Sequence, residues 1–260
     1  MDIPEQILPE GFLALPVELQ QRIIADGHQI GEKVVSHATQ VLIGPPWRLR
    51  TKGHVNHASG VQIEIAGTRY LATAAHVIRA GAKRLRNEQH VLFQVGNAIV
   101  PLLERVVYLD DALDLAFVRI EDVECRDIAT ACWRPTSWPP SPVVDDEYVA
   151  FAGYPRRYVE YDGRGGLILN AIGGILRVDS ASDRRLTSVL ARSDLILQKG
   201  PEIPPQGSEL GGMSGGPVFR VKDSSIELVA VIKEDSQEFD AYFFAPLAGV
   251  SFEPSDRIAV

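Results

Sequence analysis

The feature that most constrains the fold of this chain is a serine between two pairs of glycines, in the segment ELGGMSGGPVF at residues 209–219. Glycine allows backbone conformations that larger residues avoid, so the pattern predicts a tight turn with an exposed backbone. The apolar residues that follow Pro217 predict a strand leaving this turn. Such a turn suits Ser214 as a nucleophile, but a serine hydroxyl needs a neighbouring base, and the base needs a group that orients it. Taken alone, the segment is also consistent with a structural turn that has no chemistry.

Two upstream segments supply candidates for these groups. His76 lies in the apolar run LATAAHV at residues 71–77, and Asp114 opens the segment DLAFV at residues 114–118. Taken singly, His76 is also consistent with a core histidine and Asp114 with a strand-end cap. Asp110 and Asp111 are weaker candidates, because they are expected in an exposed turn. The three segments follow one another in the order His, Asp, Ser, which is one of the orders that catalytic triads take.

Together, the segments TAAH, DLA and GxSGGP resemble the chymotrypsin-like (trypsin-fold) serine proteases, and most of all their bacterial HtrA and glutamyl-endopeptidase branches. The resemblance implies an all-β fold of two six-stranded antiparallel β-barrels with a short N-terminal helical extension. It also implies a serine endopeptidase in which His76 is the general base, Asp114 orients it and Ser214 is the nucleophile. The backbone N–H groups of Gly212 and Ser214 take the positions of the oxyanion hole. Gly60, preceded by Ser59, resembles the small pair that begins the strand behind the catalytic histidine.

The same resemblance assigns the substrate pocket to the residues before the nucleophile and to the strand end at 230–235. The expected lining residues are Ser208, Leu210, Ile232 and Lys233. Ser208 stands where cleavage after Lys or Arg needs an Asp, so basic specificity is not expected. Ile232 favours a small or apolar residue before the cleaved bond, whereas Lys233 favours an acidic one, and both readings stay open.

The residue before the nucleophile bears on how such an enzyme is activated. In many trypsin relatives a freed N-terminus pairs with an Asp at that position. Here the position holds Met213, which forms no ion pair. Activation by N-terminal cleavage of that type is therefore not expected.

Composition narrows the class of partner and the compartment. A net charge of −8 and a pI near 5.3 argue against nucleic acid or an anionic membrane as the main partner, which leaves a protein or peptide substrate. No apolar run has the ~18 residues of a membrane span, and no signal peptide is evident. Neither of the two cysteines, Cys125 and Cys132, lies near His76 or Ser214, which favours a reducing, cytoplasmic location. A bridge between these two cysteines is the alternative, and no metal or cofactor is expected.

The chain divides into an extension and a protease domain. Residues 1–36 form the helical extension, with a helix over 16–35 interrupted near Gly27 and Gly31. It is expected to pack on the back of a barrel, and a docking site for a regulatory partner is the alternative. Residues 37–260 form the protease domain, with a first barrel at 37–122, a Pro- and Trp-rich crossing at 123–146 and a second barrel at 147–260. The 46 residues after Ser214 leave no room for a PDZ domain of the HtrA kind.

Two other functions are compatible with these residues. A catalytically silent protein of the same fold would bind peptides without cleaving them, and an esterase would use the same three side chains. The intact set of His76, Asp114, Ser214 and the glycines favours an endopeptidase over the silent module. Pocket shape separates the peptidase from the esterase, and the sequence does not reveal it.

Overall fold

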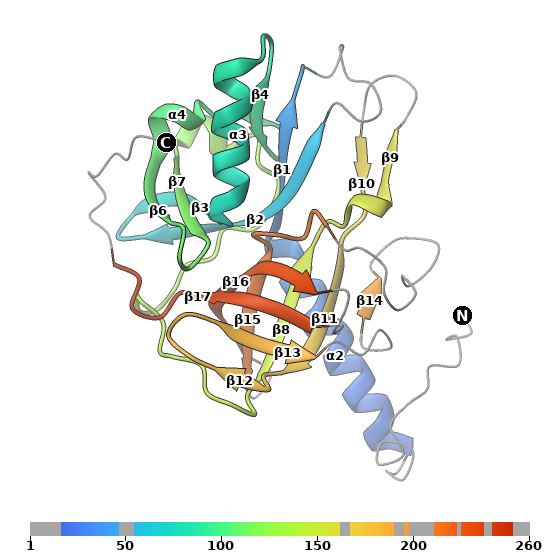
Figure 1. The fold of residues 1–260 in the computed structure, drawn as a ribbon. Coiled ribbons are helices and arrows are strands. Elements are labelled where there is room, and N and C mark those ends of the chain that lie inside the picture. Colours follow the sequence, from blue (N-terminus) through green and yellow to red (C-terminus); the bar gives the residue numbers. More distant parts are fainter. Residues whose placement is uncertain are drawn as a thin grey trace.

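Two curled antiparallel sheets make up most of the computed structural model, which describes residues 17–46, 55–161, 167–189, 195–197, 211–222, 225–236 and 241–251 (Figure 1). The expected all-β architecture of two antiparallel units is confirmed. Within the described residues the sheets have seven and eight strands, where six each were expected.

The first sheet has the strand order β5-β4-β1-β2-β3-β7-β6. Its strands are β1 (Ala38–Gly44), β2 (Asn56–Ile65), β3 (Thr68–Thr73), β4 (Leu92–Val95), β5 (Ala98–Ile99), β6 (Val106–Asp110) and β7 (Leu115–Ile120). The hairpin between β2 and β3 turns at Ala66 and Gly67, which both have positive φ. Most positions of β3 and β7 are buried, because alternate residues enter two apolar clusters on opposite faces of the sheet.

The second sheet has the order β12-β13-β17-β16-β15-β8-β11-β14. Its strands are β8 (Tyr148–Gly153), β11 (Ile172–Arg177), β12 (Ser180–Ala181), β13 (Leu186–Val189), β14 (Leu195–Leu197), β15 (Pro217–Lys222), β16 (Ser225–Ser236) and β17 (Ala241–Pro246). A separate pair, β9 (Val159–Tyr161) and β10 (Leu167–Leu169), follows the short 3₁₀ helix η2 (Arg156–Tyr158). The central position of β15 beside β8 and β16 holds the glycine-rich turn that precedes it against the body of the protein.

Helices interrupt the first sheet where the sequence indicated only strands or loops. Helix α3 (Ala75–Asn87) follows β3 directly, and the short helices α4 (Leu102–Arg105) and α5 (Asp122–Cys125) flank β6 and β7. The apolar segment at 102–108, which by its composition suits a strand, is helical in its first half and a strand only from Val106. Leu102 is buried there as a helical residue, packed on the same core as Ile78 of α3, so its burial did not require a strand.

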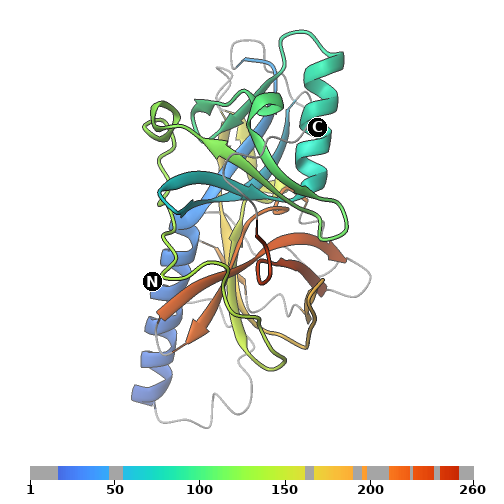
Figure 2. The ribbon, with the colours of Figure 1, turned by 90° about the vertical axis from the view of Figure 1, so that its left-hand side faces the viewer.

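The N-terminal helix α2 (Val17–His37) is continuous, and the predicted interruption near Gly27 and Gly31 is wrong. Its C-terminal turns pack on the second sheet, where Val34 and Val35 are buried, whereas its N-terminal turns extend away from the sheets (Figure 1). A helical glycine costs about 1 kcal/mol relative to alanine, which the burial of two valines offsets. Figure 2 shows α2 against the second sheet and α3 against the first, at opposite ends of the molecule.

Apolar clusters fill the space between the sheets and inside each of them. The cluster between the sheets contains residues from both, together with Val34 and Val35 of α2. The crossing segment is fixed to this region, because Trp133 hydrogen-bonds through its backbone to Gln62 and Glu64 of β2, both at 2.8 Å. Cys125 and Cys132 are free thiols. None of the helices in the described ranges combines the length and the apolar character needed to cross a membrane.

Candidate active site

His76 lies in the first turn of α3, directly after β3. The first N–H groups of an α-helix have no partner inside the helix, and Ala74 at the cap position offers no side chain to them. Asp114 supplies the missing acceptor, since its Oδ1 accepts the backbone N–H of His76 at 2.8 Å. A negative charge is also favoured at this end of the helix dipole. The carboxylate therefore caps the helix that carries the histidine.

The second oxygen of this carboxylate orients the imidazole. His76 Nδ1 lies 2.8 Å from Asp114 Oδ2, and the two side chains are 53% and 13% exposed. Asp114 has a φ of 59°, in the left-handed region that Asp tolerates better than most residues. With Nδ1 held by the carboxylate, Nε2 is the ring nitrogen left to exchange a proton with another group.

The neighbouring carboxylates have other partners. Asp110 Oδ1 accepts the backbone N–H groups of Ala112 and Leu113 at 2.8 and 2.9 Å, which shapes the turn between β6 and β7. Asp111 forms an exposed ion pair with Arg79 at 2.7 Å. Of the three candidate aspartates, only Asp114 contacts His76.

Ser214 lies in a turn that needs glycine at specific positions. Gly212 and Gly215 have φ values of 100° and 87°, where a Cβ is strained. A Cβ on Gly215 would overlap Thr73 Oγ1 and the carbonyl oxygen of Ser59. The turn therefore packs directly against the first sheet. Only glycine, which lacks a Cβ, fits this close contact at position 215.

Two backbone N–H groups of the turn, those of Gly212 and Ser214, donate to no acceptor within the described residues. The carbonyl of Gly211 accepts the N–H of Arg156 at 2.7 Å, and the carbonyl of Met213 accepts that of Gly216 at 2.9 Å. A trans peptide directs its C=O and N–H in opposite directions, so these two bonds also fix the directions of the free N–H groups. Fixed, unpaired donors of this kind are suited to stabilising an oxyanion.

Ser59 of β2 connects the first sheet to this turn. Its N–H donates to the Ser214 carbonyl at 3.0 Å, and its Oγ donates to the Gly212 carbonyl at 2.8 Å. The same Oγ accepts the N–H of Tyr154 at 2.9 Å, and the Ser59 carbonyl accepts Thr73 Oγ1 at 2.8 Å. Ser59 is fully buried. This residue thus ties the turn of Ser214, on the second sheet, to the sheet that carries His76.

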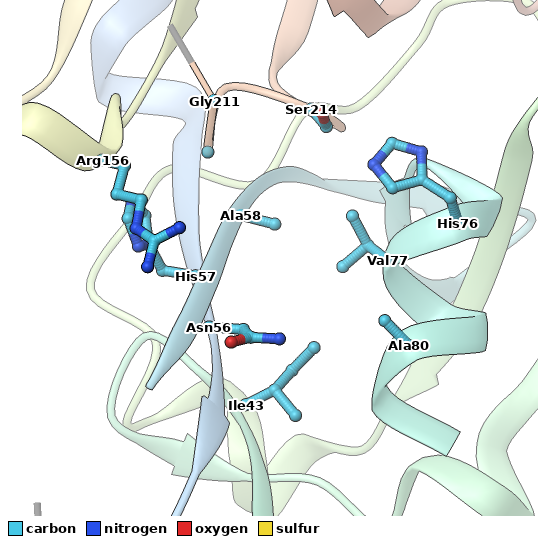
Figure 3. Close-up of a pocket in the computed structure, with 11 residues that line it drawn as sticks. Ile43, Asn56, His57, Ala58, His76, Val77, Ala80, Arg156, Gly211 and Ser214 are labelled. Atoms are coloured by element: carbon cyan, nitrogen blue, oxygen red, sulfur yellow. The ribbon is translucent and has the colours of Figure 1, made fainter. Parts of the chain in front are cut away.

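His76 and Ser214 line one pocket of about 240 Å³ (Figure 3). One wall comes from α3 and the floor from the end of β1 and the start of β2; the lining residues are Ile43, Asn56, His57, Ala58, His76, Val77, Ala80, Arg156, Gly211, Gly212 and Ser214. In the part of the chain that the structure describes, no hydrogen bond joins His76 Nε2 to Ser214 Oγ. Hydrogen bonds between catalytic groups are often long in a free enzyme and shorten when substrate binds.

The wall opposite α3 is formed by His57 and Arg156, two residues that the sequence did not single out (Figure 3). A Cβ on Gly212 would lie 2.5 Å from His57 Nε2, so this imidazole packs against the glycine. Burial lowers the pKa of His57 to about 4, the Arg156 charge acts in the same direction, and a hydrogen bond with the Tyr154 backbone opposes the shift. His57 is therefore neutral at pH 7.

The residues predicted for the substrate pocket fall in different places. Ser208 and Leu210 lie outside the described residues. Ile232 is 1% exposed, and its backbone binds Gly215 and Gly216 at 2.7 and 2.8 Å. Lys233 is partly buried at an irregularity of β16. Neither Ile232 nor Lys233 lines the pocket of Figure 3.

Met213, the residue before the nucleophile, is an apolar anchor. Its side chain is 1% exposed, and its sulfur accepts the hydroxyl hydrogen of Tyr242 at 3.3 Å. Among the described residues, no three His, Cys, Asp or Glu side chains gather closely enough to hold a metal ion.

Comparison with known families gives one match, and comparison with solved structures gives several. The model of the trypsin-like peptidase domain matches residues 58–231, which is more than half of the chain. A thermostable serine protease, AL20, from an extremophilic microorganism is 16% identical, with 82% of this chain and 92% of that chain covered and a TM-score of 0.47. The protease Anisep from Arthrobacter nicotinovorans is 14% identical, with 84% and 92% covered and a TM-score of 0.45. No curated protein matches the chain.

Proposed function

Because the chain belongs to the trypsin-like peptidase family, we propose that it is a serine endopeptidase that cleaves peptide bonds through an acyl-enzyme on Ser214. The observation that carries the proposal is the Asp114–His76 pair facing, across one pocket, a serine on a turn with two N–H groups that have no acceptor among the described residues. Each of these groups has the role that this chemistry needs.

In the first step Ser214 Oγ attacks the carbonyl carbon of the peptide bond. His76 Nε2 takes the hydroxyl proton, and Asp114 stabilises the imidazolium that forms because its Oδ2 already accepts the Nδ1 proton. The carbonyl oxygen gains negative charge and binds to the N–H groups of Gly212 and Ser214. Since both peptides are held by hydrogen bonds before substrate arrives, little reorganisation is needed.

In the second step the C–N bond breaks, and His76 gives its proton to the leaving nitrogen. This leaves an ester between Ser214 and the acyl part of the substrate. Water then attacks the ester with His76 again as the base, and the carboxylic acid product leaves. No metal or cofactor takes part in these steps.

We further propose that the enzyme works on protein or peptide substrates in a reducing compartment, the cytoplasm. The free thiols of Cys125 and Cys132 are compatible with such a compartment. The residue before the cleaved bond stays an open choice between apolar and acidic, because Ser208 and Leu210 lie outside the described residues.

Labelling with a fluorophosphonate probe tests the proposal. The probe reacts with an activated serine, so wild type is expected to be labelled and Ser214→Ala and His76→Ala are not. Well-folded wild-type protein that takes no label would contradict an active serine and favour the catalytically silent peptide-binding module. If labelled enzyme hydrolyses ester substrates but no member of a peptide library, the esterase alternative replaces the peptidase.

A further inference from the structure

The pocket of Figure 3 lies on one side of Ser214, and β16 lies on the other. Backbone hydrogen bonds of Gly215 and Gly216 to Ile232 attach the turn to β16. The end of β16 is also where the pocket for the residue before the cleaved bond, the acyl pocket, is predicted. No residue of β16 lines the pocket of Figure 3, whose other wall is His76, Val77 and Ala80 of α3. His76 gives its proton to the leaving nitrogen, so the substrate chain beyond the cleaved bond continues along α3. The pocket is therefore placed for residues that follow the cleaved bond.

The charge of this pocket contrasts with that of the whole chain. The chain has a net charge of −8, yet no Asp or Glu is among the described residues that line the pocket. Of these described lining residues, Arg156 alone has a permanent charge. Its side chain is exposed and forms no ion pair with a described carboxylate, and Figure 3 shows its guanidinium at the pocket wall. A guanidinium beside a pocket, without a carboxylate partner among the described residues, favours a ligand carboxylate, which it binds in a bidentate way.

The backbone holds Arg156 in this place independently of its side chain. Arg156 N–H donates to the Gly211 carbonyl at 2.7 Å, which fixes the start of η2 beside the turn of the nucleophile. Replacing the side chain therefore leaves this hydrogen bond intact. Such a variant tests the charge of the guanidinium and not the shape of the turn.

His57 adds an uncharged polar group to the same wall. Its Nε2 is buried against Gly212, whereas the ring lines the pocket. The ring therefore adds a neutral, polarisable surface beside Arg156 and no charge that would repel the guanidinium or compete with it. The remaining wall is apolar, from Ile43, Val77 and Ala80, and suits the methylene groups of a side chain.

We propose that Arg156 and His57 select substrates with an Asp or Glu at the first or second position after the cleaved bond. The proposal rests on the proposed function, since it names a substrate class for the same site. It is separate from the residue before the cleaved bond, which the acyl pocket recognises.

Partitioning of an acyl-enzyme tests this selection without knowledge of the acyl specificity. p-Nitrophenyl acetate acetylates Ser214, and intact mass shows the adduct in wild type and its absence in Ser214→Ala. An amino acid amide then attacks the acetyl carbonyl, the ester bond to Oγ breaks, and His76 transfers the amine proton to Oγ. The products are an N-acetyl amino acid amide and free enzyme, and water gives acetate instead. The acceptors are the amides of Asp, Asn, Glu and Gln, each alone and after one alanine.

The expected result is a preference for acidic over neutral acceptors of about tenfold, as the gain of a charge-assisted hydrogen bond over a neutral one predicts. Arg156→Gln is expected to remove the preference and Arg156→Lys to keep part of it. His57→Gln is expected to weaken it. Arg157→Gln is the matched control, because its guanidinium lies over the Tyr158 ring at 5.6 Å and does not line the pocket, so the preference persists.

Two results would overturn the selection while the proposed function stands. One is equal yield from acidic and neutral acceptors in wild-type enzyme that forms the acetyl adduct. The other is a preference that survives Arg156→Gln. An unchanged preference in His57→Gln removes His57 from the proposal. Failure of wild type to form the adduct on Ser214 contradicts the proposed function itself, and the selection falls with it.

Discussion

Replacing Ser59 with alanine removes one hydroxyl that two buried backbone groups share. Its Oγ donates to the Gly212 carbonyl at 2.8 Å and accepts the Tyr154 N–H at 2.9 Å, and Ser59 is fully buried. The variant leaves both backbone groups without this partner. Each unsatisfied buried group costs about 1–3 kcal/mol, so with two such groups the free energy of unfolding is expected to fall by about 2–6 kcal/mol.

The same change acts on the chemistry of the turn. The Gly212 carbonyl loses its link to the first sheet, so the Gly212–Met213 peptide, which lies between the N–H groups of Gly212 and Ser214, is held less firmly. Loss of about 1.4–2.8 kcal/mol of transition-state stabilisation slows fluorophosphonate labelling by about ten- to a hundredfold. The effect requires no contact between Ser59 and the probe.

Urea unfolding measures the first effect and the labelling rate the second. Ser36→Ala is the matched control, because its hydroxyl donates to the Lys33 carbonyl at 2.7 Å on an exposed face of α2. This variant is expected to change stability by less than about 0.5 kcal/mol. If Ser59→Ala unfolds and labels as wild type does, the hydroxyl does not hold the turn and the reasoning is wrong.

Three further variants test other parts of the site. Asp114→Asn presents a donor to His76 and is expected to slow labelling by about 10³–10⁴-fold while a folded circular dichroism spectrum persists; labelling at the wild-type rate would contradict the orienting role. Gly215→Ala overlaps Thr73 at a positive φ, so it is expected to lose more than about 2 kcal/mol in urea unfolding, and a stable variant would disprove the close contact. His57 has a lower pKa when folded, about 4, than the ordinary 6.5, so the unfolded chain takes up the proton first and stability falls between these pH values. Between pH 7 and pH 4 the free energy of unfolding of wild type is expected to fall by up to about 3 kcal/mol more than that of His57→Gln. If the two proteins show the same dependence of this free energy on pH, burial does not lower the pKa of His57.

Strands β1 and β7 were predictable from the sequence because they are short, mostly apolar runs of the length that strands have. The segments at 38–43 and 115–120 coincide with β1 and β7 almost residue for residue. Helix α3 was not predicted, because Ala74 supplies no capping signal and the acceptor at its N-terminus is Asp114, which lies far along the chain. A helix whose N-terminal cap comes from a residue distant in the sequence cannot be predicted from the residues around its first turn.

The candidate site divides in a similar way. The sequence alone named His76, Asp114 and Ser214, because each lies in a recognisable short motif. Their catalytic roles stay a prediction. His57 and Arg156 were not, because each stands in an ordinary strand or turn sequence and becomes notable only where β2 and η2 meet beside Gly212. Pairing with segments distant in the chain, and not residue type, makes them part of the pocket.

The division of the proposed catalytic groups between two sheets has a consequence for a chain during its synthesis. His76 and Asp114 adjoin strands of the first sheet, whereas the turn of Ser214 is anchored to β16, which itself pairs with β17. A nascent chain can complete the first sheet while the strands that hold Ser214 have still to emerge. Since the proposed mechanism needs all three side chains, we expect a nascent chain to stay inactive until these last strands have docked.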